Sequence, residues 1–441
     1  MSKHIDELVD GKIDAVKKRM NIFEVGRVSK VLNYIVAVDG LEKAGFFERV
    51  IIEDRAEGYI SAINQRNTVV ALTKKTGDIH IGDPVIATGK EFRGLYSMDS
   101  IGHVVDMFAE DKLEERKFDN VIELPIETKP ISIMDRGNVN RPMLTGVTGI
   151  DMIYPVGRGQ RQLIIGDKKT GKTQLALDAI LNQKDRNMLC IYIAVGKTKK
   201  EVKEVYIELL RRGAMQYTII LAAFNDECPP VLRNTPFVGL SVAEHYMLHD
   251  KMDVLVVIDD LKRHADICRE MSLLAGKVPG RDAYPSDIFF THARMLEKGC
   301  QHKNGGSITI LPIVETKGGD ITDYISTNVI SITDGQIVLS SKNIKKGQKP
   351  AIDYGLSVSR LGGAVQTKEI KKIGAVVRQE LLSYLEKCDV YELANMDEMS
   401  PELRNRMLTG REIRKRLNQY KFSPLPLEKM AGLFDGLVEY D

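Results

Sequence analysis

The apolar residues follow three different patterns in three successive parts of the chain. From about Phe23 to Thr88, short runs rich in valine and isoleucine alternate with polar residues and glycine, as in VGRVSKVLNYIVAV and TVVALT. Closely spaced alternating strands of this kind predict a small β-barrel. The charged opening segment 1–20 is expected to form a short amphipathic helix before it.

The middle of the chain changes to nearly continuous apolar runs separated by amphipathic stretches, after a less periodic segment from Arg93 to about Thr145. Such strands, buried on both faces, predict a parallel sheet that helices cover on both sides. Strands are expected at Gln162–Ile165, Met188–Val195, Tyr217–Phe224, Met252–Asp259 and Ser307–Val314, and helices at Thr173–Leu181, Lys199–Arg212, Ser241–Asp250 and Leu261–Ala275.

From about Glu369 the pattern becomes helical, as in AVVRQELLSYLEKCDVYELA and GREIRKRLNQY. The sequence therefore predicts a multidomain α/β protein. We expect a helix and β-barrel domain over residues 1–92, a nucleotide-binding domain over 93–368 and a C-terminal helical domain over 369–441.

The composition mainly excludes certain kinds of protein and site. The 441 residues carry 63 basic and 61 acidic side chains, a net charge of +2 that gives no strong field for nucleic acid or an anionic membrane. Apolar runs are too short for a transmembrane helix. His245 and His249 are expected to be structural. The five cysteines show no C-x-x-C spacing, which indicates a reducing compartment and no zinc site: Cys190, Cys228, Cys268, Cys300 and Cys388.

The stretch GDKKTGKT, Gly166 to Thr173, fits the phosphate-binding pattern G-x-x-x-x-G-K-[ST] between a strand and a helix. Backbone amides of such a loop face the phosphates, and the helix N-terminus adds partial positive charge. Lys172 would reach the β- and γ-phosphates, and the Thr173 hydroxyl would bind Mg²⁺. The candidate nucleotide-binding residues here are Gly166, Asp167, Lys168, Lys169, Thr170, Gly171, Lys172, Thr173 and Gln174.

A second half of such a site is an apolar strand that ends in an acid, and MDVLVVIDDL supplies Asp259. Its carboxylate would join the Mg²⁺ shell, typically through water. Asp260 is expected to be a solvent-facing or capping residue. Together the two motifs predict binding of ATP or ADP with Mg²⁺.

Four stretches make a family resemblance specific: GRGQRQLIIGDKKTGKTQLALDAILNQ, KVPGRDAYPSDIFFTHARMLEK, NVISITDGQI and PAIDYGLSVSRLGGAVQTK. The chain resembles alpha subunits of F-type rotary ATP synthases along nearly its whole length. The resemblance implies a barrel crown, a RecA-like nucleotide domain and a helical C-terminal domain in an alternating ring of six. It also implies catalytic beta-type partners, a central-stalk gamma-type subunit, peripheral-stalk and membrane subunits, a peripheral place at the cytoplasmic face of a membrane, and no nucleic acid.

The resemblance also predicts that this chain does not hydrolyse nucleotide. Catalytic beta subunits carry a water-polarising glutamate after the glycine that ends the next strand, and alpha subunits carry glutamine. In LCIYIAVGKTKK that position is Lys197. A charged ammonium cannot accept a proton from water.

The family motif SVSRLGG assigns Arg360 a different role. It matches the arginine that alpha subunits insert into the neighbouring beta site, and Ser357 lies in the same motif. A guanidinium supplied in trans can offset charge that builds on the γ-phosphate in the transition state.

The base-binding positions depart from the family. Where alpha subunits have an Arg-Pro pair and two glutamines, this chain has Lys349 and Pro350, then Gln419 and Lys421. The chain also ends with LEKMAGLFDGLVEYD, where alpha subunits usually continue. The sequence is thus expected to be a divergent alpha paralogue with a shortened C-terminal domain and altered nucleotide selectivity.

Two alternatives stay open at this point. A self-sufficient hexameric ATPase of the flagellar or secretion type would need a glutamate at position 197. A ring-shaped RNA translocase resembling the terminator Rho would need a basic, aromatic surface on the barrel, where aromatic residues are scattered.

Overall fold

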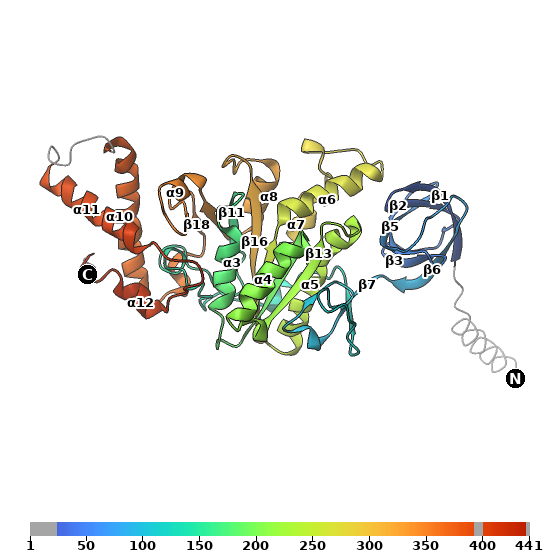
Figure 1. Cartoon of the computed structure of the whole chain (residues 1–441), viewed down its shortest axis with the longest axis horizontal. Helices are drawn as coiled ribbons and strands as arrows, with labels where there is room; N and C mark the ends of the chain where they lie inside the picture. The colour runs from blue at the N-terminus through green and yellow to red at the C-terminus, as the bar shows by residue number, and fades with distance from the viewer. Residues whose placement is uncertain (1–23, 392–399, 438–441) are drawn as a thin grey trace.

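A computed structural model describes residues 24–391 and 400–437. Three parts follow one another along the long axis: a barrel at one end, a central α/β domain and a group of helices at the other end (Figure 1). The predicted multidomain α/β architecture is confirmed. The helix expected within residues 1–20 lies outside the described residues.

The barrel closes because its strands alternate apolar and polar side chains, so each can bury one face. Val36, Val50 and Ile52 in its interior are fully buried. Six antiparallel strands are hydrogen-bonded in the order β1-β2-β5-β4-β3-β6, and β1 pairs with β6 to complete the circle. Their bounds are β1 Glu24–Leu32, β2 Ile35–Asp39, β3 Glu48–Ile52, β4 Ala56–Ile63, β5 Thr68–Lys75 and β6 Pro84–Glu91.

The central domain is built on a sheet of ten strands whose main path runs β18-β17-β11-β16-β14-β12-β13-β8. The pairs from β17 to β8 along this path are parallel, as the apolar runs predicted. The strands are β8 Val104–Val105, β10 Arg136–Gly137, β11 Leu163–Asp167, β12 Met188–Lys197, β13 Thr218–Phe224, β14 Asp253–Asp259, β15 Cys300–His302, β16 Ser307–Thr316, β17 Gly335–Leu339 and β18 Val358–Ser359. A small separate sheet pairs β7 Arg93–Tyr96 with β9 Ile122–Pro125.

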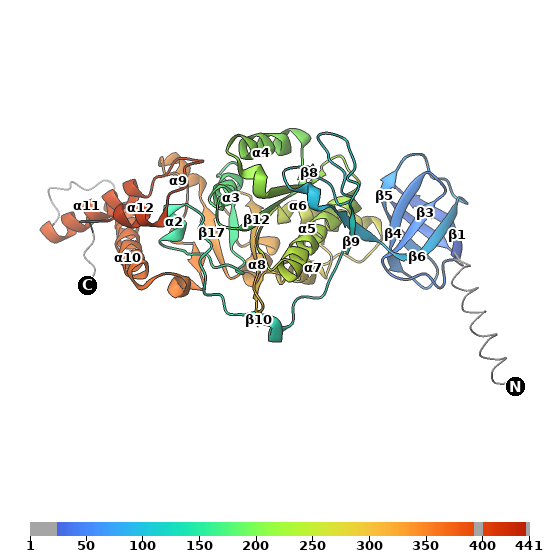
Figure 2. The same ribbon diagram turned by 90° about the horizontal axis from the view of Figure 1, so that it is seen from below.

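Helices cover both faces of this sheet, because successive side chains of a strand point to opposite sides. On β12, Ile191 and Ile193 pack with helices α5 to α8, whereas Cys190 and Tyr192 pack with α3 and α4. Figure 2 shows α4 and α7 on opposite sides of the strands. The helices of this domain are α2 Thr148–Asp151, α3 Lys172–Leu181, α4 Lys199–Arg211, α5 Pro229–His249, α6 Leu261–Leu274, α7 Ile288–Leu296, α8 Tyr324–Ile332 and α9 Ser341–Lys345. Short 3₁₀ turns occupy Met98–Ser100, Ile133–Asp135, Ala214–Tyr217, Arg281–Ala283 and Gly362–Val365.

One predicted helix begins too late in the sequence. The helix expected over Ser241–Asp250 already begins at Pro229 and contains Pro236. Prolines are tolerated in the first turn of a helix, where their missing N–H has no intrahelical partner. The pair Pro229–Pro230 therefore opens α5 instead of separating it from the preceding strand.

The C-terminal part consists of α10 Lys368–Tyr391, α11 Pro401–Arg416 and α12 Leu427–Gly432. Ile373, Val377 and Leu381 of α10 and Ile413 of α11 are buried and join the core on the α3 side of the sheet. The helical ending that the sequence predicted is confirmed.

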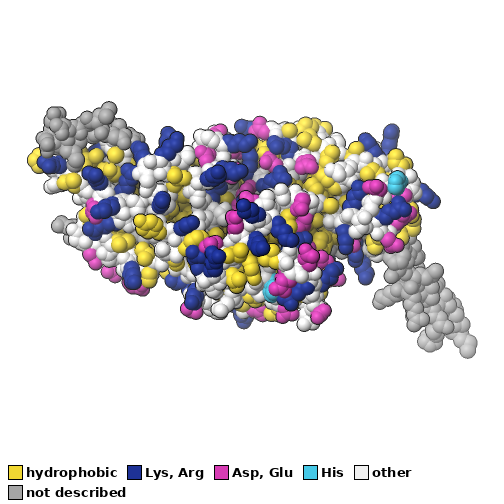
Figure 3. Space-filling model, in the orientation of Figure 1, with side chains coloured by type: hydrophobic (Ala, Val, Ile, Leu, Met, Phe, Trp, Pro, Cys, Tyr) yellow, Lys and Arg dark blue, Asp and Glu magenta, His cyan; other side chains and the backbone are white. Residues whose placement is uncertain are grey.

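The surface reflects the balanced composition. Basic and acidic side chains are interspersed over the face shown in Figure 3. Within the described residues, none of the helices has the combination of length and apolar sequence that crossing a bilayer requires.

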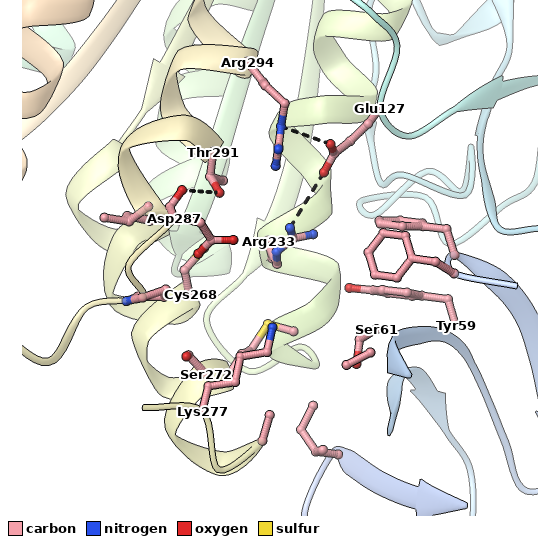
Figure 4. A pocket seen from close by; sticks show the side chains of 18 residues that line it. Tyr59, Ser61, Glu127, Arg233, Cys268, Ser272, Lys277, Asp287, Thr291 and Arg294 are labelled. Carbon is pink, nitrogen blue, oxygen red and sulfur yellow. Dashed lines mark hydrogen bonds and ion pairs between the residues drawn. The ribbon is translucent and has the colours of Figure 1, made fainter. Parts of the chain in front are cut away.

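The barrel and the central domain enclose a cavity of about 280 Å³ at their junction (Figure 4). The ring of Tyr59 stacks on that of Phe47, with centroids 4.8 Å apart, and forms the barrel side. On the opposite wall, Glu127 pairs with Arg233 at 3.7 Å and with Arg294 at 3.3 Å. The two arginines share one carboxylate, so these charges pair with one another within the central domain.

Candidate functional site

The loop between β11 and α3 has the geometry of a phosphate cradle. Gly166 must be glycine, because a Cβ there would lie 2.3 Å from the carbonyl oxygen of Leu339. Gly171 has φ +97° and caps the N-terminus of α3, a conformation that favours glycine. Lys168 and Lys169 are exposed at the turn of the loop. The amides that open α3 therefore face a site where an anion can approach.

Lys172 folds back into this loop. Its Nζ donates to the Asp167 carbonyl oxygen at 2.6 Å and lies 3.8 Å from Glu315 Oε2. Thr170 Oγ1 donates to the same carbonyl at 2.7 Å. Burial lowers the pKa of Lys172. The ammonium thus lies inside the loop, close to the place where the phosphates of a ligand are expected to bind.

The carboxylate of Asp167 stabilises the loop from its other side. It accepts hydrogen bonds from Thr316 Oγ1 and the Gly319 N–H, both at 2.7 Å. Burial opposes ionisation, but these hydrogen bonds hold the pKa of Asp167 below its ordinary value. Asp167 therefore connects the phosphate loop to the segment after β16.

The two halves of the predicted site meet at Asp259. Its Oδ2 accepts hydrogen bonds from Thr173 Oγ1 and from the Tyr192 hydroxyl, each at 2.7 Å. Its Oδ1 lies 2.7 Å from Lys197 Nζ. The carboxylate is almost completely buried, with 1% of the residue exposed. Three donors, one of them a cation, therefore surround this one aspartate.

The next residue, Asp260, is a helix cap. Its Oδ1 accepts a hydrogen bond from the Arg263 N–H at 2.6 Å at the start of α6. Its Oδ2 also lies 3.5 Å from Lys197 Nζ. Of the two roles expected from the sequence, capping is the one that the structure shows.

Lys197 is held in its charged form. Burial disfavours the ammonium, but the carboxylates of Asp259 and Asp260 outweigh burial and raise its pKa well above the ordinary value. The residue sits at the end of β12, directly before the capping box that Thr198 and Glu201 form at the start of α4. A fixed ammonium therefore lies at the end of β12, where the family resemblance predicts a water-polarising side chain.

The donor chemistry of the site fits Mg²⁺ in part. A threonine hydroxyl from the phosphate loop and a carboxylate from the neighbouring strand are the protein groups that usually hold this ion. Thr173 and Asp259 supply both and are in direct contact. Lys197 adds a positive charge on the second oxygen of the same carboxylate.

A cleft of about 420 Å³ opens beside this cluster. Thr173, Gln174 and Lys197 line one side, and Lys421 with Phe422 of the C-terminal part line another. Phe422 is fixed there, because its N–H donates to Asp178 Oδ1 at 2.7 Å and the Arg212 guanidinium stacks on its ring. The cleft thus joins the phosphate loop to a segment more than two hundred residues away in the sequence.

The model for the nucleotide-binding domain of the ATP synthase alpha/beta family matches residues 146–359. The ATP synthase subunit alpha of Acetivibrio thermocellus is 38% identical over 434 residues, which span 97% of this chain and 84% of that protein. This chain belongs to the ATP synthase alpha/beta family. The subunit alpha of Lactobacillus johnsonii is 40% identical over 97% of this chain and 85% of its own length. The sodium ion specific subunit alpha of Acetobacterium woodii is 36% identical, over 97% and 84%. Within the family the chain is an alpha-type, nucleotide-binding subunit, as the resemblance predicted.

The expected base-binding residues of this alpha-type subunit lie close together, but they differ in whether their side chains are free to contact a ligand. The Gln419 N–H donates to the Lys349 carbonyl at 2.7 Å, so the Lys349–Pro350 pair lies beside it. The Gln419 amide is engaged within the fold: Nε2 donates to the carbonyls of Gly146 and Ser423, and Oε1 accepts from the Thr148 N–H. Lys421 is exposed and lines the cleft.

The two residues of the SVSRLGG motif have different surroundings. Ser357 is buried, donates to the Asp353 carbonyl at 2.6 Å and accepts from the Val338 N–H at 3.0 Å. It thereby fixes the turn that leads into β18. Arg360 follows β18 at the edge of the sheet and is exposed, with one guanidinium hydrogen bond of 3.4 Å to the Ile330 carbonyl. It does not lie among the residues of the chain's own cleft.

Some members of the site were not predicted from the sequence. Tyr192 lies on the α3 face of β12, and its hydroxyl reaches Asp259. The signal was present, because a tyrosine inside an otherwise aliphatic strand needs a partner for its hydroxyl when buried. Phe422, which lines the cleft, and Asp178, which accepts the hydrogen bond of its N–H, carry no comparable local signal.

Proposed function

We propose that this chain is the non-catalytic, nucleotide-holding subunit of a rotary F-type ATPase ring, and that its Arg360 acts in the active site of a neighbouring catalytic beta-type subunit. The observation that carries the proposal is the ion pair of Lys197 with Asp259. A site whose water-facing group is a half-buried, paired ammonium can hold a phosphate chain but has no base in that position for an attacking water.

The nucleotide, ATP or ADP, is proposed to bind with its phosphates in the loop Gly166–Thr173 and beside Gln174. Its base would lie toward the C-terminal part, near Lys349, Pro350, Gln419 and Lys421. Thr173 and Asp259 are the groups that would hold Mg²⁺. When bound, the ion supplies a Lewis-acidic charge to the phosphate oxygens.

The partners follow from membership of the alpha type. We propose alternation with beta-type subunits around a central-stalk gamma-type subunit, with peripheral-stalk and membrane subunits completing a complex at the cytoplasmic face of a membrane. The exposed guanidinium of Arg360 at the edge strand supports a role across an interface. Ser357 supports it indirectly by fixing the turn before Arg360.

Arg360 is tested in the assembled ring. Trans arginines in phosphoryl transfer contribute about 10³–10⁵-fold in kcat. Arg360→Ala is therefore expected to reduce ATPase activity of the reconstituted ring by at least about 10³-fold at saturating nucleotide. Arg360→Lys should recover little, because lysine keeps the charge but lacks the planar fork.

The rates are compared for rings of equal mass by light scattering, with Arg66→Ala on an exposed barrel loop as the matched control. A near-normal rate for Arg360→Ala in a fully assembled ring would refute the trans role.

The non-catalytic character is tested with the chain alone. The purified chain should bind nucleotide but release no measurable phosphate from ATP. Turnover by the isolated chain that disappears in Lys172→Ala would instead establish a self-sufficient ATPase.

A further inference from the structure

The phosphate site carries its own fixed cation next to the groups expected to hold a metal. Lys197 Nζ lies 2.7 Å from Asp259 Oδ1 and 3.5 Å from Asp260 Oδ2, and 23% of its side chain is exposed. Thr173 Oγ1 binds the other oxygen of Asp259. The ammonium and the metal-binding hydroxyl are therefore two neighbours of a single carboxylate.

We infer that Lys197 replaces part of the charge of the divalent cation, so that this site takes a nucleoside di- or triphosphate with little dependence on Mg²⁺. The inference rests on the proposed nucleotide binding and specifies the form of ligand that the site prefers. In this assignment Lys197 determines metal dependence and takes no part in bond breaking.

Charge balance supports the assignment. Lys172 pairs with Glu315, and Lys197 pairs with Asp259 and Asp260, while Glu201 lines the cleft close by and Arg263 lies beside Gly196. Without Lys197 neither Asp259 nor Asp260 would keep the lysine that pairs with both, and their negative charge would oppose an incoming polyphosphate. With Lys197 the excess negative charge is smaller, and the incoming phosphates meet two lysines.

The competition between Lys197 and a divalent ion for the Asp259 carboxylate also supports the assignment. A divalent ion at Thr173 and Asp259 would share its carboxylate with an ammonium in a largely buried place, where like charges repel more strongly than in water. Lys197 also lines the same cleft as Thr173, so its ammonium is within the space that a ligand enters. It need not move from another part of the molecule to meet a phosphate.

The test measures binding rather than turnover. The full chain is titrated with trinitrophenyl-ATP, followed by fluorescence, once with excess MgCl₂ and once with excess EDTA. The wild-type Kd is expected to change by less than about threefold between the two conditions, whereas Lys197→Gln should bind at least about tenfold more weakly in EDTA than in Mg²⁺. Lys197→Arg, which keeps the charge, should behave like the wild type.

Lys200→Gln is the matched control, because Lys200 is exposed on α4 and is not part of the cleft. It should leave both Kd values unchanged. Thermal melting by circular dichroism checks that each variant is folded. If Lys197→Gln does not fold, the wild-type Kd values in Mg²⁺ and in EDTA still show whether binding depends on the metal.

The outcomes are distinct. A wild-type Kd that rises tenfold or more in EDTA, to the same extent as in Lys197→Gln, would overturn the role of Lys197 and leave nucleotide binding intact. Failure of the wild type to bind in either condition, with Lys172→Ala no different, would instead overturn the proposed nucleotide site.

Discussion

Strand β14 carries a buried aspartate at each end, and the two carboxylates are held in different ways. At the first residue, Asp253 accepts two hydrogen bonds from the Arg141 guanidinium, at 2.8 and 2.9 Å, and a third interaction from Arg158. Ser307 Oγ adds a hydrogen bond of 2.6 Å. At the last residue, Asp259 has one lysine and the hydroxyls of Thr173 and Tyr192.

The difference separates a structural carboxylate from one that a ligand can reach. Arginine forks match a carboxylate in a planar, bidentate geometry that is costly to break. Lysine is a point charge on a flexible stem, and a hydroxyl can rotate toward a new partner. Asp259 also faces a cleft, whereas Asp253 lies at the opposite end of the parallel strands. The same residue type on one strand is therefore fixed at one end and exchangeable at the other.

The largest expected effect comes from removing the structural carboxylate. Asp253→Ala leaves Arg158, whose side chain is 18% exposed, and Arg141 without their shared anion. Loss of one partner of a buried ion pair costs about 3–5 kcal/mol. Because Arg141 is more exposed, at 44%, we expect a loss of about 3 kcal/mol in the free energy of unfolding, measured in urea.

Asp259→Ala is the matched variant at the other end of β14. Lys197 keeps Asp260 as a partner and some access to water, but the buried Tyr192 hydroxyl loses its acceptor, so the loss of stability should be about 2 kcal/mol, smaller than in Asp253→Ala. The Kd for trinitrophenyl-ATP should change in Asp259→Ala, and in folded Asp253→Ala it should equal that of the wild type. Equal losses of stability in the two variants would break the comparison between the two ends.

Two hydroxyls sharpen the same contrast at a smaller scale. Ser307→Ala and Tyr192→Phe each remove one hydrogen bond to a carboxylate that keeps its other donors, so each should cost about 1–2 kcal/mol. Only Tyr192→Phe should weaken nucleotide binding, by a few-fold, because it loosens the carboxylate beside Thr173. Identical Kd values for Tyr192→Phe and wild type would show that the orientation of Asp259 does not matter to the ligand.

Much of the fold could be predicted because local patterns decide it. The parallel strands appear as apolar runs, and the observed β14 Asp253–Asp259 differs from the expected Met252–Asp259 by one residue. The phosphate loop was predicted equally well, since its glycines and Lys172 are local requirements of the strand-loop-helix turn. The start of α5 was missed because Pro229 has two opposite meanings, as a breaker inside a helix and as a first residue of one.

The ion pair of the site was beyond local patterns. Lys197 meets Asp259 because β12 lies next to β14 in the sheet, with Ala194 opposite Asp259, and strand order is a property of the whole fold. The engagement of the Gln419 amide by Gly146 and Thr148 likewise depends on how the C-terminal part packs against the central domain. The sequence indicated which residue types belong to the site, and tertiary contacts decide what each of them binds.

A third carboxylate, which forms no ion pair with any residue that the structure describes, gives the smallest and most specific prediction. Asp178 on α3 accepts from the Phe422 N–H and from Gln174 Nε2, and burial raises the pKa of Asp178 to about 6. The folded state therefore keeps this proton up to about pH 6, whereas the unfolded chain releases it near its ordinary value of 3.8. The contribution of Asp178 to stability should therefore rise as the pH falls through that window, by about 1 kcal/mol between about pH 7.5 and about pH 5.5. The buried His264 and His292, whose pKa values burial lowers, contribute in the opposite direction, so the effect of Asp178 is measured against a variant.

The contribution of Asp253 to the pH dependence of stability has the opposite sign. Burial opposes its ionisation, but the guanidiniums of Arg141 and Arg158, with Ser307, hold the pKa of Asp253 below its ordinary value. Its contribution is present above the unfolded pKa of 3.8 and is lost as the pH falls through the lower folded value. Urea unfolding across the pH range separates the two. Asp178→Asn keeps an oxygen for the Phe422 N–H and should lower the stability at about pH 5.5 relative to that at about pH 7.5 by about 1 kcal/mol more than in the wild type, while leaving the acid limb unchanged. If the change in stability between these two pH values is the same in Asp178→Asn and the wild type, Asp178 does not contribute to it, and the contrast between carboxylates with and without an ion pair does not extend to α3.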